Sequence, residues 1–143
     1  MNHRSTTLYE EFLSLTRVIR SAFDQRAAQL GLTFARAKLL TAIGRNPGAS
    51  QAELAAVLDI ETPTLKRLLD ALEAQGLAVR RPLPGDGRKH AVFLTETSRT
   101  EPLLRFREEI EAALVKGVAP TDLMAMRRVL GKMTRNAQEM RHI

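Results

Sequence analysis

The sequence contains no cysteine and no tryptophan, and aromatic residues make up only 4% of its 143 residues. Without cysteine the chain has no disulfides, no thiolate metal sites and no cysteine-based oxidant switch. No segment approaches the ~20 apolar residues of a membrane helix, and the amino terminus has no apolar run of the signal-peptide type. We therefore expect a cytoplasmic protein that does not contact the membrane.

Signatures of catalysis are missing as well. The histidines, His3, His90 and His142, show no metal-ligand spacing. The sequence also has no glycine-rich phosphate loop, and no serine, histidine and aspartate are placed for nucleophilic catalysis. We expect no enzyme, no cofactor and no metal site; a metal sensor built from histidine and carboxylates is not excluded but has no residue pattern in its favour.

Hydrophobic residues make up 44% of the chain, and its formal net charge is +6. The first value is typical of a globular protein, and the length suffices for one domain with a sizeable core. Strand patterns are confined to one short region, so we expect a mostly helical fold. The positive charge fits a polyanionic partner, although a solvated basic face would give the same total.

Two consecutive helix signals stand at the centre of the sequence. Residues 50–53 have the form of a capping box, and the helix that they start should end near Asp59. Thr62 is then expected to cap a second helix whose first position is Pro63 and whose left-handed C-terminal cap is Gly76. The buried stripe of this helix is formed by leucines at helical spacing, namely Leu65, Leu68, Leu69 and Leu72.

Two short helices separated by about three residues must cross steeply, as in a helix-turn-helix. The second helix of such a motif points its N-terminal end at the base edges of DNA. Short hydroxyl and basic side chains lie on this end, away from the leucines: Thr62, Thr64, Lys66 and Arg67, followed by Asp70. The first four are our candidates for contacts with bases and nearby phosphates.

After the second helix the pattern changes from helix to strand. Residues 77–81 and 91–94 are predicted strands, and residues 82–90 form a connector of turn formers in which Asp86-Gly87 is a strong hairpin signal. Between Thr62 and Ala91 the cations exceed the carboxylates by three, which is half of the net charge. Three cations of the hairpin are candidates for phosphate contacts, namely Arg80, Arg81 and Lys89.

Amphipathic helices flank this central region. One is expected over residues 8–30, and a second is capped by Thr33. Beyond the hairpin, Thr95 is expected to cap a long helix with a kink or restart at Pro102, and a last helix begins near Pro120. The first helix is too long for a small monomer to cover its apolar side, so pairing with a second copy is the economical interpretation.

These segments together resemble the MarR family of transcription regulators. The resemblance covers nearly the whole chain, and Ser98 is one departure from it, because many members have glycine there. Its motifs are residues 54–58, the helix from Thr62 to Gly76, Leu77-Ala78-Val79-Arg80-Arg81, the wing Asp86-Gly87-Arg88, and Leu94-Thr95-Glu96.

The resemblance implies roles that the residues alone do not establish. It implies that Arg88 enters the minor groove, that Asp86 helps to hold the wing, and that the terminal helices of two subunits interdigitate into a dimer. It also implies that a small, often phenolic or anionic, effector binds between the dimer platform and the winged helix. No residue set identifies this ligand; Arg17 and Arg20 could face such a cleft, but ordinary surface positions explain them equally simply.

We therefore predict one mostly α-helical domain over residues 1–143, with a winged helix-turn-helix and a two-stranded β wing over residues 32–95. Residues 1–31 and 96–143 are predicted dimerisation helices. The expected function is that of a homodimeric regulator, most simply a repressor, that binds a pseudo-palindromic operator in double-stranded DNA. The alternative is a winged helix used for non-specific DNA packaging or for protein contacts.

Overall fold

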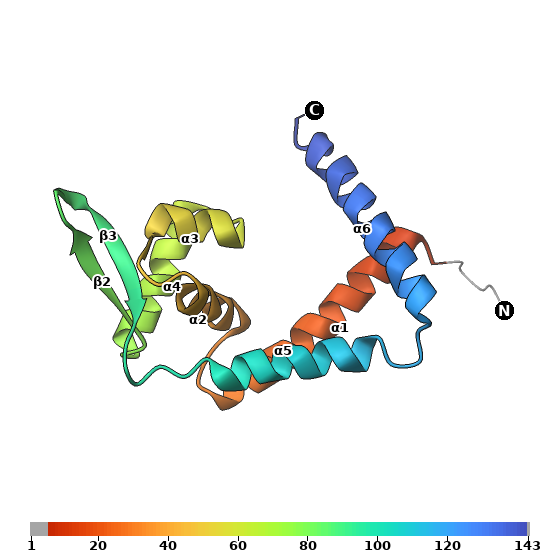
Figure 1. The fold of residues 1–143 in the computed structure, drawn as a ribbon, viewed down its shortest axis with the longest axis horizontal. Helices are drawn as coiled ribbons and strands as arrows, with labels where there is room; N and C mark the ends of the chain where they lie inside the picture. Colours follow the sequence, from red (N-terminus) through yellow and green to blue (C-terminus); the bar gives the residue numbers. More distant parts are fainter. Residues whose placement is uncertain (1–5, 143) are drawn as a thin grey trace. The chain divides into compact units, whose positions relative to one another are not determined.

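The computed structural model describes residues 6–142, which form six helices and three short strands (Figure 1). In chain order these are α1 (Leu8–Gln29), α2 (Phe34–Arg45), β1 (Ala49–Ser50), α3 (Gln51–Leu58), α4 (Thr62–Ala74), β2 (Ala78–Leu83), β3 (Asp86–Leu94), α5 (Glu101–Leu114) and α6 (Pro120–Met140). The chain forms two compact units, the first ending at Arg107 and the second beginning at Glu108. The predicted mostly helical fold with a β wing is confirmed.

The core of the first unit lies among α2, α3, α4, the small sheet and the start of α5. Its fully buried large side chains are Leu39, Leu40, Ile43, Leu54, Leu65, Leu69, Leu72, Val92 and Leu103. The predicted leucine stripe of α4 is confirmed, with Leu68 only partly buried at its edge. Because each fully buried leucine contributes roughly 1.5–3 kcal/mol, this stripe holds α4 against the rest of the winged helix.

Side-chain caps begin the first three helices. The Thr7 hydroxyl and the Glu10 carboxylate form a complete capping box at α1, which the sequence analysis did not anticipate. The predicted caps at Thr33 and Ser50 are confirmed. At α3 the Ser50 hydroxyl accepts from the Glu53 amide at 3.1 Å, which is the Ser50 half of the predicted box.

The turn between α3 and α4 is as short as predicted, and Asp59 ends α3 in the left-handed conformation with φ 51°. The predicted start of α4 was wrong by one residue. Glu61 is the N-cap, its carbonyl accepts from the Leu65 amide at 3.0 Å, and Pro63 is the second helical residue. Since proline lacks an N–H, it fits either of the first two positions, and its presence alone does not fix the start.

The end of α4 is as predicted, with Gly76 at φ 74°. The Leu77 amide donates to the Leu72 carbonyl and the Gly76 amide to the Glu73 carbonyl, both at 2.9 Å, which is the hydrogen-bond pattern of a Schellman motif. This turn sends the chain from α4 directly into β2.

The wing belongs to an antiparallel sheet with strand order β1-β3-β2. Strands β2 and β3 extend the predicted strands 77–81 and 91–94 toward the tip of the hairpin. The two-residue strand β1, in which Ala49 pairs with Val92, was not predicted. Figure 1 shows the β2–β3 hairpin, in green, extending beside α3 and α4. Its base is thus fixed both to α4, through the Gly76 turn, and to the start of α3.

The predicted helix cap at Thr95 was wrong. The Thr95 hydroxyl donates to the Gly76 carbonyl at 2.6 Å, and the Ser98 hydroxyl donates to the Leu77 carbonyl. Helix α5 begins at Glu101, so Pro102 lies in its first turn and causes no kink. Ser98, the departure from the family pattern, therefore has a structural role in holding the turn after α4. No helix among residues 6–142 is long and apolar enough to cross a membrane.

Candidate nucleic-acid interface

The N-terminal end of α4 presents polar side chains away from the core. Thr62, Lys66 and Arg67 are exposed, and Thr64 is half-buried. Neither cation forms an ion pair with a carboxylate in the described part of the chain. Their charges are therefore available to a polyanion, whose condensed counterions would be released on binding.

Glu61 lies at the same end of α4 and was not among the predicted site residues. Its side chain is exposed and forms no capping hydrogen bond. A carboxylate at this position can accept from cytosine N4 in a major groove, as glutamate and aspartate do in DNA complexes. The available sequence signal was the Thr62-Pro63 pair, which allows the helix to start after Glu61.

The tip of the wing differs from the prediction. The ladder pairs Leu83 with Asp86, so the two turn residues are Pro84 and Gly85, and Asp86-Gly87 lies in β3. Gly85 has φ 85°, which together with a preceding proline is the arrangement of a type II turn. The hairpin signal at Asp86-Gly87 therefore marks a strand irregularity and not the turn.

The irregularity in the β2–β3 pairing determines where the cations Arg88 and Lys89 lie. The ladder passes from the pair Pro82 and His90 directly to Leu83 and Asp86, so Gly87, Arg88 and Lys89 have no partners on β2. The Asp86 carboxylate accepts from the Arg88 amide at 3.1 Å and replaces a missing ladder bond. Arg88 and Lys89 are both exposed on this bulge, without carboxylate partners among residues 6–142.

Arg81 is exposed near the base of the wing. Its guanidinium lies 5.2 Å from the centre of the Phe93 ring, within the range of a cation–π contact. Phe93 also packs close to Gly48, where an added Cβ would lie 3.3 Å from the ring. The ring thus supports the guanidinium of Arg81, while the residue as a whole stays exposed.

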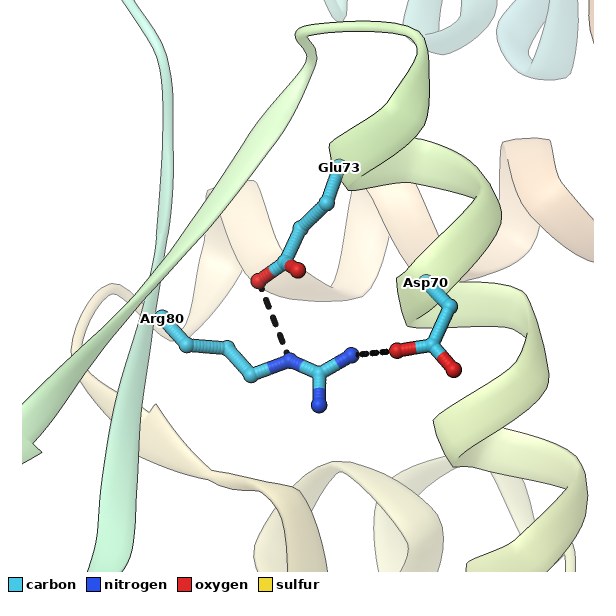
Figure 2. A network of polar contacts seen from close by, with 3 residues as sticks. All are labelled: Asp70, Glu73 and Arg80. Atoms are coloured by element: carbon cyan, nitrogen blue, oxygen red, sulfur yellow. Dashed lines mark hydrogen bonds and ion pairs between the residues drawn. The ribbon is translucent and has the colours of Figure 1, made fainter.

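Among the predicted site cations, Arg80 alone is held by carboxylates in the part of the chain that the structure describes. Figure 2 shows its guanidinium reaching from β2 to two carboxylates on α4. Arg80 Nη2 bonds Asp70 Oδ1, and Arg80 Nε lies 3.0 Å from Glu73 Oε1. Its side chain is only 17% exposed. This geometry favours a structural role for Arg80 over a phosphate contact.

A hollow of about 190 Å³ lies in the first unit between α1, α2 and the α3–α4 region. Its lining residues are Arg20, Phe34, Ala35, Lys38, Leu58, Ile60 and Leu68. The charged ends of Arg20 and Lys38 lie 5.2 and 5.5 Å from the centre of the Phe34 ring. The hollow therefore combines an apolar floor with two cations. No three metal-binding side chains gather among the described residues.

Comparison with known proteins adds to this geometry. Residues 30–89 match the sequence model of the MarR family. The transcriptional regulator SlyA superposes with a TM-score of 0.85 at 20% identity, over 94% of this chain and 96% of that chain. MepR of S. aureus, in a complex with DNA, gives 0.87 at 24% identity over 92% and 99%. A further MarR family transcription regulator gives 0.78 at 26% identity over 98% and 96%. The predicted resemblance to the MarR family is confirmed.

Proposed function

Starting from this confirmed resemblance to the MarR family of transcription regulators, we propose that the chain recognises a specific DNA operator as a homodimer and represses transcription from it. The observation that supports this best is the pair of uncompensated cation groups, Lys66 with Arg67 on α4 and Arg88 with Lys89 on the wing bulge. The S. aureus MepR structure with which this chain superposes is a DNA complex, which supports a similar use of the same fold here.

The proposed contacts follow the chemistry of each group. Thr62, Thr64, Lys66 and Arg67 contact bases and nearby phosphates in the major groove, and Arg88 enters the adjacent minor groove with Asp86 fixing its backbone. Arg81 and Lys89 bind phosphates, which position the protein without selecting a sequence. Arg80 was also a candidate phosphate ligand, but its guanidinium is already paired with Asp70 and Glu73.

A second copy of the chain is the proposed partner of the terminal helices. Large apolar side chains remain exposed on α1 and α6 when the chain is taken alone. Their exposed fractions are 65% for Leu8, 71% for Tyr9, 64% for Val18, 72% for Met124, 45% for Val129 and 69% for Met140. An exposed apolar surface of this kind marks an interaction site. The two copies of α4, the recognition helix, would enter major grooves about one helical turn apart in a symmetric dimer.

The hollow beside Phe34 is the proposed effector site. Two cations over an apolar floor suit a small aromatic anion, and a phenol would use the same stacking surface. Such a ligand weakens DNA binding only if it prefers the conformation that does not fit the operator, and each tenfold preference is worth about 1.4 kcal/mol. Benzoate should weaken operator binding by the wild type, and Lys38→Ala should remove this effect without altering binding in its absence.

Selection from a pool of random duplex DNA at physiological salt tests the main proposal. A repressor of this kind should enrich a pseudo-palindrome with half-site centres about 10 bp apart, and bind it roughly 10³-fold or more above random DNA. A bound pool without enrichment would support the alternative, a winged helix for DNA packaging or protein contacts, and would overturn sequence-specific regulation.

A further inference from the structure

The ion pairs of Arg80 join two parts of the molecule that each face DNA in the proposed function. We propose that Asp70, Glu73 and Arg80 form a clamp that sets the orientation of the recognition helix α4 relative to the wing. In this role Arg80 is a positioning residue, which acts on DNA through α4 and Arg88. The inference rests on the proposed function and assigns Arg80 a different part in it from that of a phosphate ligand.

The charges around Arg80 argue against direct phosphate binding. Two carboxylates face one guanidinium, so the group of three residues is net negative before any DNA arrives. The Arg80 side chain is 17% exposed, whereas those of Asp70 and Glu73 are 56% and 33% exposed. A phosphate would have to displace carboxylates that already neutralise the cation. Arg67, Arg88 and Lys89 offer a phosphate exposed cations without this competition.

The backbone of Arg80 gives the clamp a fixed base. Arg80 pairs in the ladder with Val92, whose side chain is fully buried, and Val92 pairs on its other side with Ala49 of β1. The guanidinium therefore extends from a part of the sheet where all three strands pair side by side. Because the guanidinium contacts Asp70 and Glu73, it restrains α4 relative to the sheet (Figure 2).

The two contacts on α4 restrain rotation as well as distance. Asp70 and Glu73 are three residues apart, so they lie on one face of the helix with a rise of about 4.5 Å between them. Two such points on one face oppose both rolling and tilting of α4. Arg67 lies three residues before Asp70, on the same side. Binding sites need their groups held within roughly 0.5 Å and 10–20°, so the ion pairs on the outer side of α4 add to the restraint that the leucines give on its inner side.

The two possible roles of Arg80, in the clamp or as a phosphate ligand, predict opposite changes in operator affinity for one variant. Asp70→Asn with Glu73→Gln removes two negative charges and would release Arg80 for DNA. If Arg80 were a phosphate ligand, this variant would bind every DNA more tightly. If the clamp positions α4, operator affinity should fall roughly tenfold, within the range found for coupled neighbouring residues, while affinity for random DNA stays equal or rises.

The matched control is Glu53→Gln with Glu96→Gln. Both carboxylates are exposed, lie in the same unit and have no partner among the described side chains. Their removal changes the net charge by the same amount as the clamp variant does. The control should bind both DNAs slightly more tightly. A triple variant, Asp70→Asn, Glu73→Gln and Arg80→Gln, guards against unfolding caused by an unpaired Arg80. Thermal melting of each variant confirms that it is folded, and the triple variant should lose operator affinity like the double.

A double-mutant cycle measures the coupling between the clamp and Arg88 in operator binding, which a loss of fold stability alone would not change. If the clamp sets the wing relative to α4, Arg88→Ala should cost the clamp variant several-fold less operator affinity than it costs the wild type. Purely additive losses, or tighter operator binding by the clamp variant, would overturn the clamp while leaving sequence-specific binding intact. If the wild type itself enriches no operator, the proposed function fails, and the role of the clamp in operator recognition fails with it.

Discussion

Replacing Arg88 by alanine tests the wing at the residue that is proposed to enter the minor groove. Arg88 lies on the β3 bulge, outside the ladder, and has no carboxylate partner among residues 6–142. Its removal therefore breaks no internal ion pair, so the free energy of unfolding should change little. The effect of Arg88→Ala should therefore appear only in DNA binding, and the change in operator Kd measures the contribution of this side chain.

A close groove contact by arginine is worth roughly 1–3 kcal/mol, so Arg88→Ala should raise the operator Kd between about 5-fold and 150-fold. If the guanidinium also releases a counterion, the slope of log K against log salt should become shallower by about 0.9 per wing inserted. Affinity for random DNA should fall less, because the shape and potential of a narrow minor groove depend on sequence.

Fluorescence anisotropy with labelled operator and random duplexes, at several salt concentrations, measures both quantities. Arg88→Lys is the matched variant, since it keeps the charge and should keep the salt slope while losing part of the affinity. Asp86→Ala removes the hydrogen bond to the Arg88 amide and should give a smaller loss than Arg88→Ala. An operator Kd for Arg88→Ala equal to that of the wild type at physiological salt would exclude the wing arginine from recognition.

Three further outcomes can be measured on the same purified protein. Arg67→Ala should lower the ratio of operator to random affinity if the side chain contacts a base, and an equal loss on both DNAs would make it a phosphate ligand. Gly76→Ala should lower the free energy of unfolding by about 1–2 kcal/mol, because φ is 74° there and no steric contact adds to the cost. The control is Gly131→Ala within helix α6, which should not lower the free energy of unfolding. Light scattering at micromolar concentration should give twice the 15.9 kDa chain mass, and a monomer mass would refute the dimer.

The helices of the winged helix could be predicted because their signals are local. Thr33 and Ser50 cap the following amides, and Gly76 takes a conformation that a side chain would strain. The leucines of α4 fall at a spacing that only a helix brings to one side. Each of these features depends on residues within about two turns, so the sequence alone was sufficient to predict them.

The details of the wing depended on contacts between distant residues. Pro84-Gly85 and Asp86-Gly87 are both reasonable turns, and the choice between them is made by the register that pairs Arg80 with Val92. The same holds for Thr95, whose hydroxyl bonds the Gly76 carbonyl instead of a following helix. No local pattern distinguishes an arginine that meets two carboxylates on another element from one that meets a phosphate.

The position of α4 is determined by anchors along most of its length. The leucines hold its inner side, the Arg80 ion pairs hold its outer side, and Gln75 Nε2 just beyond its end donates to the Gly31 carbonyl at 2.9 Å. That last bond reaches the α1–α2 connection, and just beyond it the amide of Phe34, the first residue of α2, donates to Asp24 of α1 at 2.9 Å. A ligand in the hollow beside Phe34, or a partner subunit on α1, therefore has a continuous path of contacts to α4. The first turn of α4 makes no side-chain hydrogen bond within the described residues, so its polar groups remain free for DNA while the rest of the helix fixes their direction.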